Sequence, residues 1–198
     1  MTALSERITT MTTVITVYDL PEAADPPPPL DDRHTVYRAV GVPASFGWID
    51  VGDSSTPESA ALIVARAEAR TGALSGRYEA FHVNDRPAEP FAPAGHGESV
   101  LFVNCMRFAP ERHDEAFAAW ERVNRYMVGK PGYRWHRLHR RVDTDAPFGL
   151  VNVVGWESPE AWRAAHDDGF RALAGGDLPF TALPTLCRSV GARQEASR

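Results

Sequence analysis

The sequence predicts an α+β protein made of two repeats, and three observations lead to this fold class. Residues 99–190 alternate strand-like and helical segments in the order β-α-β-β-α-β, which is the order of a ferredoxin-like domain. Residues 38–58 align without a gap on residues 140–160, and eight of the 21 positions are identical. Turn-rich stretches at 21–32 and 85–99 divide the chain. We therefore expect two tandem ferredoxin-like repeats that form a pseudo-dimer of the dimeric α/β-barrel type in one chain.

The second repeat has the clearer pattern. Its apolar, β-rich segments predict four strands, at residues 99–108, 133–142, 148–156 and 181–190. Pro110 stands where a first helical residue belongs, and Gly129 ends that helix. A cap, a proline and an acid at residues 158–160 predict a second helix that runs to about Leu173.

The first repeat follows the same plan with one element missing. It predicts strands at 12–17, 35–42, 46–51 and 77–83, and a helix at 56–70. Four successive prolines at residues 26–29 cannot lie inside a helix, so an extended segment replaces the first helix. We divide the chain into a degenerate repeat at 1–84, a linker at 85–98 and a catalytic domain at 99–198.

Composition excludes several classes of function. The chain has 198 residues, 43% of them hydrophobic, and a net charge of −5. Without a basic run, nucleic acid is a poor partner. No segment approaches the ~18 apolar residues of a membrane span, so we expect a cytoplasmic protein without membrane partners. Cys105 and Cys187 are expected to be buried free thiols, and no cysteine pair or histidine cluster has the spacing of zinc ligands.

A polar residue interrupts an apolar row on the strand at residues 148–156. Alternation would place Phe148, Leu150, Asn152, Val154 and Trp156 on one face. A buried amide must find partners or cost about 1–3 kcal/mol. Asn152 is therefore either bonded to backbone or water, or it serves a site. Trp156 taken alone would be a core tryptophan.

The Asn-x-x-x-Trp-Glu-Ser pattern at residues 152–158 resembles the signature of the cofactor-free antibiotic biosynthesis monooxygenases. The resemblance covers about 90 residues and includes Val103-Asn104 and Pro131-Gly132. It implies a protein that oxidises an aromatic polyketide, anthrone or phenol, to a quinone with dioxygen and without a cofactor or metal. Members of this family form dimeric barrels, so a homodimer is possible here.

The resemblance also implies roles for individual residues. Asn152 and Trp156 would be the catalytic pair, which donates hydrogen bonds to the developing enolate and to the peroxide or carbonyl. The substrate-binding residues would be Asn104, His139, Trp162 and Arg171. Residue types alone also allow His139 to be a solvated strand-edge residue and Arg171 a surface charge.

The first repeat lacks these chemical side chains. Asp50 stands in the place of Asn152, and Ser54 in the place of Trp156. We therefore expect one site per chain, in the second repeat, with the corresponding region near Asp50 filled.

Three other functions are to be weighed for this fold, and the first lacks its expected histidine. A haem-degrading enzyme of this fold would need a histidine late in the second helix, and His166 lies one turn too early. A polyketide cyclase would bind a similar substrate but use no dioxygen. A non-catalytic protein of a pathway complex would bind without turnover.

Overall fold

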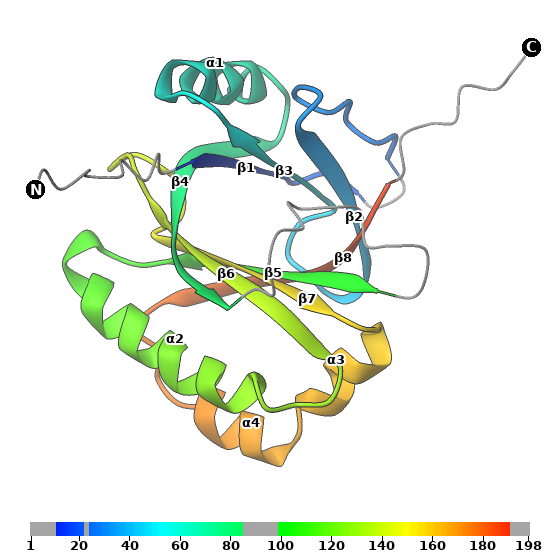
Figure 1. The fold of residues 1–198 in the computed structure, drawn as a ribbon, viewed down its shortest axis with the longest axis vertical. Helices are drawn as coiled ribbons and strands as arrows, with labels where there is room; N and C mark the ends of the chain where they lie inside the picture. Colours follow the sequence, from blue (N-terminus) through cyan, green and yellow to red (C-terminus); the bar gives the residue numbers. More distant parts are fainter. Residues whose placement is uncertain (1–10, 22–23, 85–98, 191–198) are drawn as a thin grey trace, which may run out of the picture.

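The computed structural model describes residues 11–21, 24–84 and 99–190. Within these ranges eight strands close into one barrel, with helices on its outside (Figure 1). The predicted linker at residues 85–98 lies outside the described ranges. No helix in the described part of the chain is long and apolar enough to cross a membrane.

The first half has the predicted order of elements. It contains β1 (Thr12–Tyr18), β2 (His34–Ala44), β3 (Trp48–Ser54), α1 (Pro57–Glu68) and β4 (Ala73–Asn84). The described residues between β1 and β2 form no helix, as the proline run predicts.

The second half differs from the prediction at its second helix. Its elements are β5 (Val100–Arg107), the short 3₁₀ turn η1 (Pro110–Arg112), α2 (His113–Met127), β6 (Tyr133–Arg141), β7 (Leu150–Trp156), α3 (Pro159–Ala165), α4 (Asp168–Ala174) and β8 (Thr181–Ser189). The prediction of one helix to Leu173 is wrong. His166 leaves the helical conformation, and the Asp167 side chain caps a new helix by accepting from Phe170 N at 3.0 Å.

The strand order is the same in both halves. Around the barrel the strands run β4-β1-β3-β2 and then β8-β5-β7-β6. Each half thus places its fourth, first, third and second strands side by side, which is the ferredoxin-like order. Antiparallel pairing of β2 with β8 and of β4 with β6 joins the halves, and we call these two junctions the seams. The α+β, ferredoxin-like class is thereby confirmed.

Matching caps start α1 and α3, 102 residues apart. Thr56 accepts a hydrogen bond from Ser59 N, and Ser158 accepts one from Ala161 N, both at 3.1 Å. A proline at the first helical position and an acid follow each cap. The third strand of each half therefore leads into its helix in the same way.

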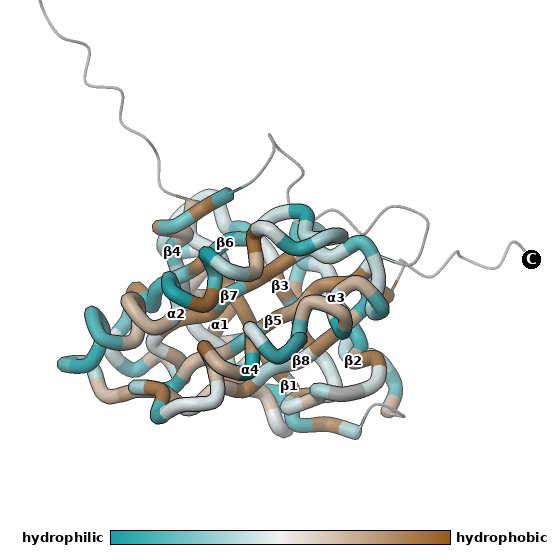
Figure 2. Tube along the Cα trace, turned by 90° about the horizontal axis from the view of Figure 1, so that it is seen from below, coloured by the Kyte–Doolittle hydropathy of each residue, from teal (hydrophilic) through white to brown (hydrophobic). Residues whose placement is uncertain are grey.

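The barrel interior forms the largest apolar core, to which both halves contribute. It includes Ile15, Val51, Val103, Val153, Cys105 and Cys187. Figure 2 shows hydrophobic stretches on the strands in the middle of the view and hydrophilic stretches near the periphery. Both cysteines are buried free thiols, as expected, and burial raises their pKa values.

Every residue of β7 is buried, because one face lies against the barrel interior and the other against the helices. Val151 and Val153 belong to the interior, whereas Val154 and Trp156 pack in a second core with residues of α2 and α3. The expectation that Phe148 shares the face of Asn152 is wrong. Phe148 precedes β7 and belongs to the interior core.

Candidate active site

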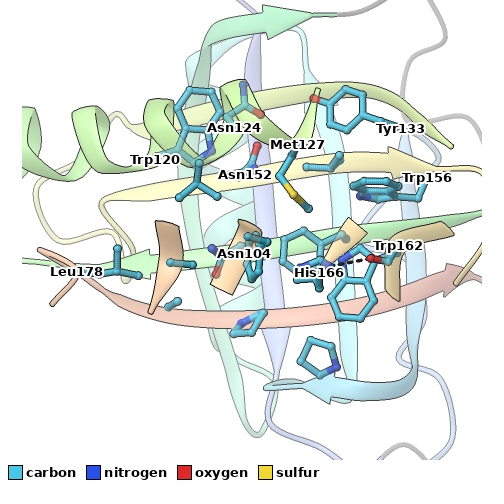
Figure 3. Close-up of a pocket in the computed structure, with 18 of the residues that line it drawn as sticks. Asn104, Trp120, Asn124, Met127, Tyr133, Asn152, Trp156, Trp162, His166 and Leu178 are labelled. Atoms are coloured by element: carbon cyan, nitrogen blue, oxygen red, sulfur yellow. Dashed lines mark hydrogen bonds between the residues drawn. The ribbon is translucent and has the colours of Figure 1, made fainter. Parts of the chain in front are cut away.

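A largely apolar cavity of about 460 Å³ lies between the outer face of the sheet and helices α2, α3 and α4 (Figure 3). Strands β5, β7 and β8 form its floor, and Pro43 of β2 adds a residue from the first half. Four predicted site residues line it: Asn104, Asn152, Trp156 and Trp162. The sheet and the helices of the second half thus bring together most of the predicted site.

The two asparagines lie side by side on the cavity floor. Asn104 of β5 and Asn152 of β7 are direct cross-strand partners, so their side chains leave the sheet on the same face. The side-chain oxygens of both are buried and have no hydrogen-bond partner among the described residues. Since an amide can exchange its oxygen and nitrogen by a flip, the pair can present either acceptors or donors to a ligand.

Three tryptophans supply flat walls and unused donors. Trp120, Trp156 and Trp162 line the cavity from α2, β7 and α3. Their indole N–H groups are buried and find no acceptor in the described part of the chain. A buried donor without a partner costs free energy, so these groups favour a ligand that accepts hydrogen bonds.

Tyr133, at the start of β6, closes one side of the cavity. Its ring meets that of Trp156 edge to face at a centroid distance of 5.3 Å. Its hydroxyl is in hydrogen-bond contact with His136 Nδ1. Burial raises the pKa of Tyr133, so the phenol stays protonated at neutral pH.

Helices α3 and α4 cover the opposite side. The His166 ring lies between Trp162 and Phe170, with centroid distances of 4.1 and 4.2 Å. His166 Nδ1 donates to Trp162 O at 2.7 Å, and burial lowers the pKa of the imidazole. This covering is therefore aromatic, and its histidine is neutral at pH 7.

A cluster of three side chains fastens the start of α4 to α2. Tyr126 Oη and Lys130 Nζ donate to the two Asp167 oxygens, each at 2.7 Å. The ammonium of Lys130 and the hydroxyl of Tyr126 hold the pKa of Asp167 well below its usual range. We call Tyr126, Lys130 and Asp167 the clasp.

Two predicted substrate-binding residues do not reach the cavity. His139 pairs with Val151 across β6 and β7, and this register turns it into the barrel interior, away from Asn152. Its Nδ1 donates to Val151 O at 3.3 Å, and burial lowers its pKa to about 4. Arg171 is exposed and pairs with Asp168 on its own helix. The expectation that these two residues contact the substrate is wrong.

The corresponding face of the first half is filled. Asp50 is buried and contacts His34 Nδ1, while its second oxygen accepts from Leu30 N at 3.2 Å. A Cβ atom at Gly52 would lie 2.3 Å from the His34 ring, so only glycine leaves room for that ring. Leu30, which follows the proline run, packs against α1. Ser54 is buried and donates to Thr56 O.

Sequence reasoning missed several cavity residues. Tyr133, Trp120 and His166 lay in predicted elements without a motif to distinguish them. Trp120 carried a signal, since it stands at helical spacing with Met127 and both line the cavity. As for metal binding, the described residues include no group of three or more His, Cys, Asp or Glu side chains that could hold an ion.

Comparison with known proteins finds a family to which the part of the chain around this site is similar. Residues 99–170 match the family model described as antibiotic biosynthesis monooxygenase. The matched segment runs from β5 into α4 and contains both asparagines and the three tryptophans of the cavity. Residues 99–170 are therefore similar to the antibiotic biosynthesis monooxygenases.

Solved structures show how far the fold extends. An anthrone oxidase-like protein is 18% identical and covers 98% of this chain and 99% of its own, with a TM-score of 0.61. A major regulator of staphylococcal pathogenesis is 7% identical over 90% of this chain and 99% of its own, with a TM-score of 0.52. SnoaB, a cofactor-independent oxygenase from Streptomyces nogalater, is 27% identical over 52% of this chain and 100% of its own, with a TM-score of 0.36. The comparison with curated proteins finds no match.

Proposed function

We propose that the protein is a cofactor-independent monooxygenase that oxidises an aromatic polyketide of the anthrone or phenol type to a quinone with dioxygen. One observation carries this proposal: buried amide oxygens and indole N–H groups that find no partner among the described residues converge on an otherwise apolar cavity. Such a cavity suits a flat, apolar molecule that bears a few oxygens. The family of residues 99–170 supports the oxygenase class, and a full-length structural neighbour is described as anthrone oxidase-like.

The chemistry begins with the acidity of the substrate. A hydroxyanthrone can lose a proton from its methylene carbon to give a resonance-stabilised anion, which can pass an electron to dioxygen directly. The amides of Asn152 and Asn104 would donate to the oxygen on which negative charge develops. Since these groups are held by adjacent strands, they need little reorganisation as the charge forms.

The tryptophans would hold the substrate and assist the later steps. Their rings pack against a flat polycycle, and the Trp156 N–H can donate to the peroxide or carbonyl oxygen. After dioxygen adds to the carbanion, loss of water from the resulting hydroperoxide leaves the quinone carbonyl. The apolar walls keep water away from these intermediates.

We further propose that the two halves are tandem repeats and that the chain is a pseudo-dimer. Support comes from the shared strand order and from the matching helix starts at an offset of 102 residues. The first repeat, residues 1–84, would supply the sheet that a second subunit supplies in single-domain relatives. The domain at 99–198 would hold the single active site, because His34 and Leu30 occupy the corresponding face of the first half.

Dioxygen uptake tests this function. Exhaustively dialysed, metal-free protein is mixed with dithranol, a hydroxyanthrone, and oxygen consumption and quinone formation are followed together. We expect one molecule of dioxygen consumed per quinone formed. Loss of activity on chelation that a metal restores would contradict the cofactor-independent reaction. Ring closure of a polyketide without oxygen uptake would indicate a cyclase, and binding without turnover a non-catalytic protein.

A further inference from the structure

A chain of three polar side chains leads away from the cavity across the outer face of the sheet, next to α2. Tyr133 lines the cavity, and its hydroxyl contacts His136 Nδ1. His136 Nε2 lies 2.9 Å from His82 Nδ1. His136 is only 1% exposed, whereas His82 is half-buried, so the chain runs from the cavity wall toward the outside.

This chain crosses between the two halves. Tyr133 and His136 belong to β6, whereas His82 belongs to β4 of the first half. The pairing of β4 with β6 is one of the two seams, and its register shifts between Ala80 and His82. Figure 1 shows the two strands side by side. The first half therefore contributes a residue that reaches, through one intermediate, the wall of the cavity.

We infer that Tyr133, His136 and His82 form a proton relay that takes the substrate proton out of the cavity and returns it after dioxygen has added. The inference rests on the proposed function, because it needs a substrate with an acidic C–H bond. Tyr133 is the catalytic residue of the relay, since it alone lines the cavity. His136 and His82 act through it.

The relay moves one proton from the substrate carbon to His82 and conserves atoms and charge. The substrate C–H bond breaks, its electron pair stays on the substrate, and the proton passes to the Tyr133 oxygen. The former hydroxyl proton moves to His136 Nδ1, and the Nε2 proton of His136 moves to His82 Nδ1. The result is a substrate anion and a His82 imidazolium. Once dioxygen has formed the peroxide anion, the same path in reverse delivers one proton to the peroxide oxygen.

Other titratable groups near the cavity do not fit this role. His139 faces the barrel interior. His166 lines the cavity, but its Nδ1 donates to the Trp162 carbonyl, so this hydrogen bond leads to no second titratable group and His166 could act only as a single base. The raised pKa of Tyr133 keeps the phenol from acting as a standing base. It can still accept a proton when it gives up its own in the same step, which requires a partner such as His136.

Aromatic packing holds the relay in line. The rings of His82 and His136 stack at 5.1 Å with an interplanar angle of 17°. Trp120 meets both rings edge to face, at 5.0 and 5.5 Å. Phe117 in turn stacks on Trp120 at 5.8 Å without lining the cavity. Phe117 also packs against the His82 ring at 6.1 Å, so it offers a packing control that removes no relay atom.

Proton exchange without oxygen isolates the relay from the oxidation. Under anaerobic conditions in D₂O, the protein is expected to accelerate deuterium exchange at the methylene carbon of dithranol. Tyr133→Phe and His82→Phe each leave an aromatic ring at the position but remove the atoms that carry the proton. We expect exchange to fall about 10²-fold in Tyr133→Phe and about tenfold in His82→Phe, within or below the usual range for acid–base groups. KM for aerobic turnover should stay near the wild-type value.

Two further variants separate proton transfer from packing. Phe117→Leu should exchange at close to the wild-type rate. His82→Ala opens a space at a half-buried position, so added imidazole should restore its exchange. Equal losses in Phe117→Leu and His82→Phe, or no rescue by imidazole, would overturn the relay.

The results distinguish the relay from the proposed function. If both phenylalanine variants exchange deuterium at the wild-type rate, the relay is wrong. The proposed oxygenase function would still stand if the wild-type protein consumes dioxygen. Relay-dependent exchange without any oxygen uptake would overturn the oxygenase and support the relay. No exchange above the buffer rate would overturn the relay whatever the oxygen uptake.

Discussion

Asn152 is the side chain whose removal should most clearly separate chemistry from binding. Asn152→Ala deletes a donor to the developing oxyanion, and one such donor is typically worth about 2.7–4 kcal/mol, or roughly 10²–10³ in rate. The apolar walls still bind the rings, so kcat should fall more than KM rises. Steady-state oxygen uptake measures both. Ser54→Ala, at the corresponding face of the first half, is the control, and an unchanged kcat in folded Asn152→Ala would refute the role.

Trp156→Phe tests the indole N–H alone. The substitution keeps most of the aromatic wall against Tyr133 and removes a donor that finds no acceptor in the described ranges of the chain. We expect a loss of about tenfold, mainly in kcat, which is smaller than for a full oxyanion donor. Because Trp156 is buried, a thermal melt must accompany the kinetics. A variant that melts like wild type and turns over at the same rate would leave Trp156 a purely structural residue.

His139 should make stability depend on pH. Burial lowers its pKa from 6.5 to about 4, so between these values the unfolded chain binds more protons than the native one. Stability is therefore lost as the pH falls from 6.5 through 4, by about 3 kcal/mol at about 1.4 kcal/mol per pKa unit. Guanidinium unfolding at pH 7 and pH 4 checks this. His139→Leu should flatten the dependence, and an equally steep loss in that variant would exclude His139 as its source.

Single residues also mark the limit of sequence reasoning. Alternation along β7 correctly grouped Asn152 with Val154 and Trp156, since side-chain period is a local property. It could not show that His139 pairs with Val151 while Leu138 pairs with Asn152, because register between strands depends on the folded sheet. The contact between His82 and His136 could not be predicted either, because it crosses a seam and a local sequence pattern does not relate residues of the two halves.

At the scale of elements, the clasp should control access to the cavity. Asp167→Ala removes the N-cap of α4 together with its links to Tyr126 and Lys130. No residue of α4 is fully buried, so little packing holds the helix in place once the clasp is lost. We therefore expect α4 to loosen and KM to rise, with a smaller change in kcat. Hydrogen exchange of the α4 amides should increase in parallel. Glu121→Ala, which loses an exposed ion pair with Arg125 within α2, is the matched control.

The break between α3 and α4 was visible in the sequence in part. Asp167 precedes Phe170 by three residues, which is the spacing of an N-cap, and Gly169 follows in the new first turn. The apolar spacing of Trp162, Ala165 and Phe170 nevertheless favoured one continuous helix. The outcome depended on the clasp, whose Lys130 lies 37 residues earlier in the chain and could not be paired with Asp167 from the sequence alone.

For the whole molecule, the seams predict how the isolated second half behaves. A fragment of residues 99–198 would expose the outer edges of β6 and β8, which pair with β4 and β2 in the intact chain. Open edges of this length favour pairing with another copy. Light scattering after size-exclusion chromatography should therefore detect a dimer or larger species, whereas the intact chain serves as the closed-barrel control. A stable monomeric fragment would contradict this expectation.

Apart from the break between α3 and α4, the order of elements along the chain followed closely from the sequence. The repeat at an offset of 102 residues anticipated the matching helix starts, and the proline run anticipated the missing helix. Closure of the barrel was expected from the class of fold. The cavity outside the barrel was not anticipated in detail, because its roof depends on where α4 docks.

The filled face of the first half has a consequence for how this protein can change over generations. In a symmetric assembly of identical subunits, any substitution appears in both copies, so a residue that helps one site alters its twin as well. Here the two faces are encoded separately. His34 and Leu30 can close one face while Asn152 and Trp156 keep the other open, and His82 can serve its neighbour's chemistry without a counterpart that must do the same. Joining the halves in one gene thus lets each be selected for a different task.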